Sequence, residues 1–303
     1  MEQIMQHMGN VKKHIYTYMS IVFLICYLIY TFFDNSGISE EVIINNEKNN
    51  IELFLKKNKK IDAIILGGSN SLQGISAENL SKYSNKYFYN LSFNNEMTHH
   101  SNYMKYLKLT TADSIRKKVR LVVYSSISLY SENIFEVLEN INVTGRQKVM
   151  NVIPTISIIS WLNTKYRLSV SDYVKYIHHG DFENNISYPY YLNDFEFKHS
   201  PLSYMIKYIV FKKKQLSLLY PNAKIIITAP PFYNKITNYQ NNYILKLSQE
   251  LEKRDIYFIA EKASRNKQIW KENNIHLNKF GREIRTKKLY NMIDTKLNHN
   301  IFN

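Results

Sequence analysis

An uncharged apolar run close to the N-terminus is the strongest hydrophobic pattern in the chain. It extends from Ile15 to Phe33, and aromatic side chains gather toward both of its ends. Because a helix rises about 1.5 Å per residue, this run spans most of a hydrocarbon core about 30 Å thick. The pattern predicts a transmembrane helix at residues 15–33, preceded by a short N-terminal segment at residues 1–14.

The charges that flank this run predict its orientation. Lys12 and Lys13 precede it, and Asp34 follows it. Basic residues favour the cytoplasmic side, so residues 1–14 are expected in the cytoplasm and the rest of the chain outside. A cleaved signal peptide is one alternative, although its apolar core is shorter and ends in small residues that are missing here. A buried core helix is another, which the length and the lack of a polar face disfavour.

Beyond a juxtamembrane linker and helix at residues 34–60, short apolar runs alternate with helical patterns. Such alternation predicts a parallel sheet with helices on both faces, a doubly wound, flavodoxin-like α/β fold of about five strands. This domain is expected to cover residues 61–298. The predicted strands are 61–66, 87–91, 119–124, 224–228 and 256–259, and the predicted helices are 46–58, 76–82, 97–116, 238–253 and 277–297.

The third and fourth predicted strands are far apart in the sequence. A crossover in a parallel sheet needs only about a dozen residues, so a segment at about residues 130–200 is interpreted as an insertion. It carries helical patterns at 133–141 and 170–178 and an aromatic stretch at 188–191. We expect a largely helical insertion that forms a cap or partner surface beside the carboxyl edge of the sheet, where ligands bind in doubly wound folds.

The 303-residue chain has a net charge of +15 and a single cysteine. Its basic residues are scattered, and the run Lys212–Lys214, for example, is interpreted as the solvated end of a helix. No zinc-finger or RNP-like spacing is present, so no nucleic acid is expected as a partner. A cationic surface favours anionic glycans or phospholipid headgroups. The lone Cys26 excludes a disulfide, and the histidine pairs at 99–100 and 178–179 cannot share one helix face, so neither metal nor cofactor is expected.

Two polar motifs fall where predicted strands end. Gly67-Gly68-Ser69 follows the first strand directly, and the glycines allow a sharp turn there. His276 lies between the last strand and the last helix, for which Asn278 is a suitable N-cap. Because the carboxyl ends of parallel strands meet at one edge of a sheet, Ser69 and His276 are expected to face each other there. Ser71 is a second nucleophile candidate, further into the turn.

These motifs resemble those of the SGNH (GDSL-like) esterases and acetyltransferases. That family has a strand ending in Gly-x-Ser and a His-Leu-Asn-x-x-Gly motif before its final helix, as residues 67–69 and 276–281 do here. The resemblance implies that Ser69 is the nucleophile and His276 the base. Where the family has an acid three residues before the histidine, this chain has Asn273. Its amide oxygen can orient the imidazole, but it cannot balance the imidazolium charge.

The resemblance also implies an oxyanion site. Residues 89–92 stand where the family has Asn-Leu-Gly, so the backbone N–H of Ser92 is expected to take the role of that glycine. Gly68 and Asn95 complete the candidate oxyanion and binding residues. The Gly-x-Asn-Asp block of the family has no counterpart in residues 125–128, after the third strand.

Residues 68–75 (Gly-Ser-x-x-Leu-x-Gly-Ile) are similar to a membrane-anchored subgroup found beside cell-surface polysaccharide biosynthesis. This implies a serine esterase or O-acyltransferase in the bacterial cytoplasmic membrane, with its main domain outside. Its expected substrate is an acylated or anionic envelope glycan, and its expected membrane partner is a glycan assembly system. The alternative is a catalytically weak or inactive domain that binds glycan or scaffolds such a system. A carboxylate within hydrogen-bond reach of His276 would favour the enzyme.

Overall fold

The computed structural model describes residues 14, 16–27, 38–92, 100–126, 175–176, 179, 181–183, 200–233, 238–271 and 276–298. By contacts, the chain divides into two compact units, residues 1–45 with 145–171 and residues 46–144 with 172–303. The smaller unit contains the predicted membrane span, and the larger unit contains most of the predicted α/β domain. Helix α2 (Ile38–Asn58) begins in the first and continues into the second.

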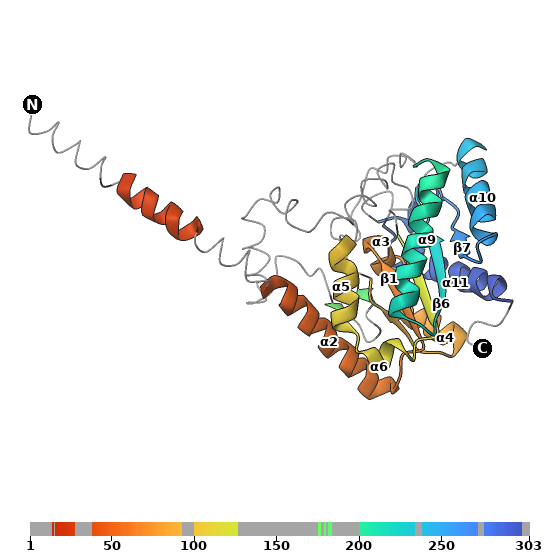
Figure 1. Cartoon of the computed structure of the whole chain (residues 1–303), viewed down its shortest axis with the longest axis horizontal. Helices are drawn as coiled ribbons and strands as arrows, with labels where there is room; N and C mark the ends of the chain where they lie inside the picture. The colour runs from red at the N-terminus through yellow and green to blue at the C-terminus, as the bar shows by residue number, and fades with distance from the viewer. Residues whose placement is uncertain are drawn as a thin grey trace, which may run out of the picture. The chain divides into compact units, whose positions relative to one another are not determined.

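In the smaller unit, residues 16–27 are helical and carry exposed apolar side chains; the helix is drawn in red in Figure 1. The side chain of Tyr18, for example, is 74% exposed, and that of Phe23 is 70% exposed. Residues 28–33 of the predicted span lie outside the described residues. Across the ranges given above, no helix reaches the combined length and apolar character that a membrane crossing requires.

A five-stranded parallel sheet forms the centre of the larger unit (Figure 1). Its strands pair in the order β2-β1-β3-β6-β7, which is the flavodoxin-like arrangement. Every predicted strand is present, with ends shifted by no more than two residues, so the predicted parallel sheet is confirmed. The strands are β1 (Ala63–Gly67), β2 (Phe88–Asn90), β3 (Leu121–Ser125), β6 (Lys224–Ala229) and β7 (Tyr257–Ala260).

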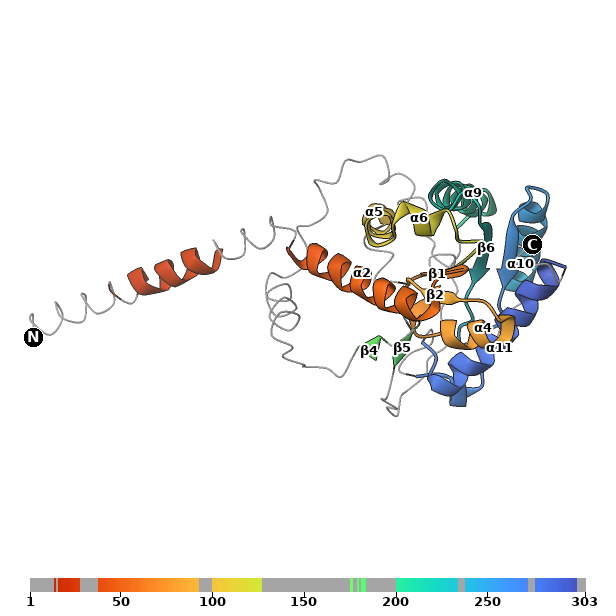
Figure 2. The same ribbon diagram turned by 90° about the horizontal axis from the view of Figure 1, so that it is seen from below.

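Helices cover both faces of this sheet (Figure 2). On one face α4 and α11 pack against each other, and on the other α9 packs against α10, with α5 and α6 on the α9 side. Ile65 and Val123 of the strands and Leu289 of α11 belong to one fully buried core cluster. The helices are α4 (Ala77–Ser84), α5 (His100–Thr110), α6 (Asp113–Arg116), α9 (Leu202–Leu219), α10 (Asn238–Glu252) and α11 (Lys279–Lys296).

Several helical expectations need correction. The predicted helix 97–116 is divided into α5 and α6, because Ala112 is extended, with φ −61° and ψ 149°. Helix α9 had no predicted bounds, although Lys212–Lys214 within it were interpreted as a helix end. Within the predicted helical pattern 170–178, Lys175–Tyr176 form strand β4, which pairs antiparallel with β5 (Phe182–Glu183). Residues 133–141 lie outside the described residues.

The interpretation of Lys212–Lys214 as a solvated helix end is wrong for Lys212. This side chain belongs to the interior of α9 and is fully buried. Its Nζ atom stands 5.1 Å from the centroid of the Tyr124 ring and 6.0 Å from that of Tyr208. The negative faces of aromatic rings attract an ammonium group, and this offsets part of the cost of removing it from water.

The described part of the insertion docks beside the carboxyl end of β2. Asp181 is fully buried and accepts hydrogen bonds from Ser76 Oγ at 2.9 Å and from the backbone N–H groups of Ala77 at 2.7 Å and Glu78 at 3.0 Å. The backbone N–H of Asn90 donates to the carbonyl of residue 179 at 2.8 Å. Residues 179 and 181–183 therefore lie at the predicted edge of the sheet, and most of the predicted cap lies outside the described residues.

Candidate active site

The structure brings Ser69 and His276 together. They are separated by 207 residues in the sequence, and Ser69 Oγ lies 2.9 Å from His276 Nε2. Ser69 opens the short helix α3 (Ser69–Leu72) directly after β1, and His276 comes two residues before the N-cap of α11. Both side chains are partly exposed, so a substrate has access to the pair. A hydrogen bond of this length between a hydroxyl and an imidazole is the contact that a serine nucleophile requires.

A sharp turn at Gly67 presents Ser69 at the end of β1. Gly67 has a φ of +139°, a conformation that other residues rarely adopt. A Cβ atom there would collide with the carbonyl oxygen of Ser125 and with Ser71 Oγ. The Gly67 N–H donates to Tyr103 Oη at 2.9 Å, which holds the turn against α5. Glycine at this position is therefore a steric requirement.

His276 is held by the segment that leads into α11. Its carbonyl accepts a hydrogen bond from the Lys271 N–H at 2.9 Å, and the next residue, Leu277, forms a β-bridge with Trp270. Asn278 is the N-cap, as predicted, because its Oδ1 accepts from the Gly281 N–H at 2.9 Å. These contacts fix the backbone on both sides of the imidazole.

The second nucleophile candidate, Ser71, is excluded by its surroundings. Its side chain is fully buried, and its hydroxyl donates to the carbonyl of Ser125. A serine that is enclosed and already donating its proton to a backbone carbonyl does not meet a substrate. Ser71 ties α3 to the end of β3 instead.

The candidate oxyanion residues are placed less favourably. The Ser92 N–H donates to Asn90 Oδ1 at 3.1 Å, and the residue is almost completely buried, so this amide is not directed at a substrate. Gly68 is the N-cap of α3 and is extended, with φ −87° and ψ −163°. Asn95 and Asn273 lie outside the described residues. In the described part of the chain, no group of three or more His, Cys, Asp or Glu side chains could hold a metal ion.

No protein-family model matches this chain, and no curated protein matches it in sequence. Among solved structures, it is similar to a family two carbohydrate esterase from Clostridium thermocellum in complex with cellohexaose. The identity is 9% and the TM-score 0.43, over 78% of this chain and 65% of that one. It is also similar to an acetyl xylan esterase from Butyrivibrio proteoclasticus, with 9% identity and a TM-score of 0.39 over 78% and 64%. The chain thus spans slightly less than two thirds of either, and likeness at this level carries no information on activity.

A buried ion pair that the sequence did not predict joins Arg285 of α11 to Glu261, the residue that follows β7, and Arg285 also donates to the carbonyl of Asn70, next to Ser69. One signal was available. Arg285 stands at helical spacing from Leu289 and Ile293, which the core buries, so its side chain falls on the buried face of α11. The partner Glu261 has no comparable local signal.

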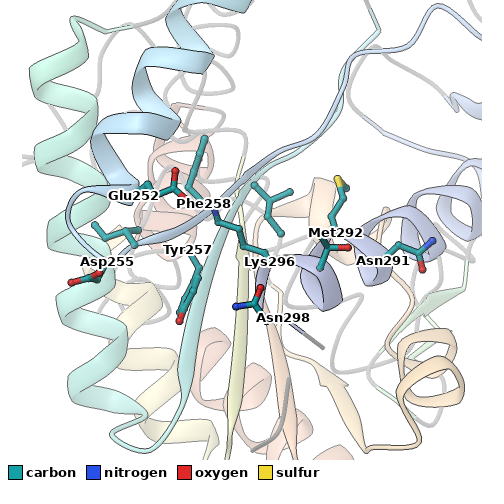
Figure 3. Close-up of a pocket in the computed structure, with 11 residues that line it drawn as sticks. Glu252, Asp255, Tyr257, Phe258, Asn291, Met292, Lys296 and Asn298 are labelled. Atoms are coloured by element: carbon teal, nitrogen blue, oxygen red, sulfur yellow. Dashed lines mark hydrogen bonds and ion pairs between the residues drawn. The ribbon is translucent and has the colours of Figure 1, made fainter. Parts of the chain in front are cut away.

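An open cavity of about 730 Å³ lies elsewhere, on the outer side of edge strand β7 (Figure 3). It is lined by the ends of α10 and α11, with Glu252, Tyr257, Met292 and Lys296 among its residues. Strands β3 and β6 separate β7 from β1, after which Ser69 stands. The cavity is therefore not part of the Ser69 site.

Proposed function

We propose that this chain is a serine esterase or O-acyltransferase of the SGNH type, with Ser69 as nucleophile and His276 as general base. The observation that carries the proposal is the 2.9 Å contact between Ser69 Oγ and His276 Nε2 at the carboxyl edge of the sheet. Nucleophile and base within hydrogen-bond reach, on the face of the fold where ligands bind, form the minimal machinery of acyl transfer.

In the proposed reaction, Ser69 Oγ attacks the carbonyl carbon of an ester while its proton passes to His276 Nε2. This step requires the neutral imidazole tautomer with its hydrogen on Nδ1. The tetrahedral intermediate then expels the alcohol, which receives the proton back from His276, and the acyl group remains on Ser69. Attack by water releases the acid and makes the protein an esterase. Attack by another hydroxyl group makes it a transferase.

The proposed catalyst is a slow one, because the sequence places Asn273 where the family has an acid. An amide can orient the imidazole but does not stabilise the imidazolium that forms. The corresponding Asp→Asn change in a serine protease triad lowers kcat about ten-thousand-fold. Turnover of activated small acyl esters is therefore the realistic assay.

The test is covalent trapping. A fluorophosphonate probe is expected to label the wild-type protein and to leave Ser69→Ala unlabelled, since the probe reacts only with an activated serine. Ser248→Ala on α10 is the matched control and should label like the wild type. Failure of the wild type to label, or equal labelling of Ser69→Ala, would leave a fold without catalysis. The protein would then be a glycan-binding or scaffolding domain.

We further propose that residues 15–33 anchor the protein in the bacterial cytoplasmic membrane with the α/β domain outside, where its substrate is an acylated envelope glycan. The helix at residues 16–27 supports this, because it carries no charge and its side chains are exposed. The net charge of +15 supports an anionic surface or glycan as partner.

Reporter fusions test this topology. Alkaline phosphatase fused after the C-terminus is expected to be active, because the enzyme folds only outside the cytoplasm. A fluorescent reporter that folds only in the cytoplasm, placed at the same site, is expected to be dark. The reverse pair of results would place the domain inside the cell and contradict the assignment.

A further inference from the structure

Arg285 makes a buried network that ends at the residue beside the nucleophile. Its Nε donates to Glu261 Oε2 at 2.8 Å, and its Nη2 donates to Glu261 Oε1 at 2.6 Å. Both side chains are only 4% exposed. The Thr228 hydroxyl, near the end of β6, donates a further hydrogen bond to Glu261 Oε1 at 2.9 Å. The pair is thus a bidentate ion pair enclosed by the sheet and α11.

The remaining donors of Arg285 reach the nucleophile's own segment. Nη1 donates to the carbonyl oxygen of Asn70 at 2.8 Å, and Nη2 donates to Ser125 Oγ at 2.8 Å. Asn70 directly follows Ser69 in α3, and Ser125 is the last residue of β3. One guanidinium therefore links the four-residue helix that carries Ser69 to the end of β3 and to Glu261, the residue after β7.

A contribution to stability does not by itself explain a buried ion pair at this position. Replacing a buried ion pair by apolar residues of similar volume is often neutral or stabilising, because both charges lose their hydration. What the guanidinium does offer is a planar set of donors whose directions are fixed relative to one another. Here one of those donors joins Arg285 of α11 to the Asn70 carbonyl of α3, and His276 lies two residues before the N-cap of α11.

We propose that Arg285 is a positioning residue for the acyl-transfer pair. By holding the Asn70 carbonyl from within α11, it sets the separation of Ser69 Oγ and His276 Nε2. The inference rests on the proposed function, since it assigns a role within that reaction. Without the guanidinium, α3 loses its tie to α11. A displacement of about 1 Å at reacting atoms can lower a rate by about a hundred-fold.

The decisive variant is the double replacement Glu261→Met/Arg285→Met. It removes both charges together, whereas Arg285→Met alone would leave a buried carboxylate without its counter-charge and would confuse misfolding with mispositioning. The double variant is expected to melt near the wild-type temperature, to label with the fluorophosphonate at least about ten-fold more slowly, and to show reduced kcat with little change in KM on a small acyl ester.

The matched control is Glu250→Met/Arg254→Met, which removes an exposed Arg254–Glu250 ion pair of 2.8 Å on the other face of the sheet. It should label at the wild-type rate. Arg285→Lys is a second test variant, because it keeps the positive charge but loses the planar set of guanidinium donors. It should be folded, with a reduced kcat and an unchanged KM.

A folded double variant that labels at the wild-type rate would overturn the positioning role. If the double variant does not fold, Arg285→Lys decides: a wild-type kcat overturns the role and a reduced kcat with an unchanged KM supports it. If the wild-type protein does not label at all, the proposed catalysis fails first, and the positioning role fails with it. The two failures are therefore distinguishable.

Discussion

Replacing His276 with Gln is expected to lower the rate of Ser69 acylation by about a hundred- to ten-thousand-fold, the usual contribution of a positioned general base. In the wild type, Ser69 Oγ lies 2.9 Å from His276 Nε2. Glutamine would retain a hydrogen-bonding group near Ser69 Oγ, but it cannot take up a proton. The measurement is the second-order rate constant of fluorophosphonate labelling at neutral pH, together with the melting temperature. A folded variant that labels at the wild-type rate would remove the histidine from the reaction.

The substitution Asn273→Asp is expected to raise the rate of Ser69 acylation. A carboxylate three residues before His276 would balance the imidazolium that forms as Ser69 loses its proton, which an amide does not do. Asn274→Asp adds the same charge one residue further along and is the control for a general electrostatic effect. A rate that rises equally in both variants would show that charge near the site, rather than a third catalytic member, is responsible.

Glu47→Gln is expected to raise the free energy of unfolding above neutral pH. Glu47 of α2 is buried, and Tyr89 Oη donates to its Oε1 at 2.8 Å. Burial raises the pKa of Glu47 from 4.5 to about 7, and hydrogen bonds from Tyr89 and Tyr106 oppose this rise only in part. The folded protein therefore holds a proton on Glu47 at pH values where the unfolded chain has released it.

The sign of the pH dependence follows from this difference. Between about pH 4.5 and pH 7 the folded state binds more protons than the unfolded state, so the free energy of unfolding falls as the pH rises and then levels off. The Glu47 contribution to that fall is about 3 kcal/mol, at about 1.4 kcal/mol for each pH unit. Glu47→Gln removes it and should melt roughly 6–12 °C above the wild type at pH 8.

The matched control for this variant is Glu52→Gln, at an exposed position of the same helix. It removes the same charge without a buried group and should leave the melting temperature close to that of the wild type. Thermal unfolding of the three proteins at pH 4.5 and pH 8 is the measurement. Equal melting temperatures of Glu47→Gln and the wild type at both values would contradict the account of Glu47.

Much of the fold could be predicted from the sequence, because the responsible interactions are local. Apolar runs such as 61–66 and 224–228 became parallel strands, since a strand buried on both faces is apolar throughout. The helix starts at Ser76 and Asn278 were predictable, because a capping side chain bonds to an amide three residues away. Once the sheet is parallel, its carboxyl ends share an edge, and this places the segments that follow β1 and β7 at the same edge.

The tertiary structure alone decided which side chains complete the site and the core. Ser92 was a candidate oxyanion donor until the fold directed its amide to Asn90, and Lys212 was assigned to the surface until two aromatic rings enclosed it. Arg285 meets the Asn70 carbonyl 215 residues away and Asp181 caps α4 from 105 residues away. Such partners leave no periodic pattern in the sequence. Each contact forms only when separate segments pack. Burial then makes the pairing of a charge or an amide energetically important, and the neighbouring residues in the sequence do not reveal that partner.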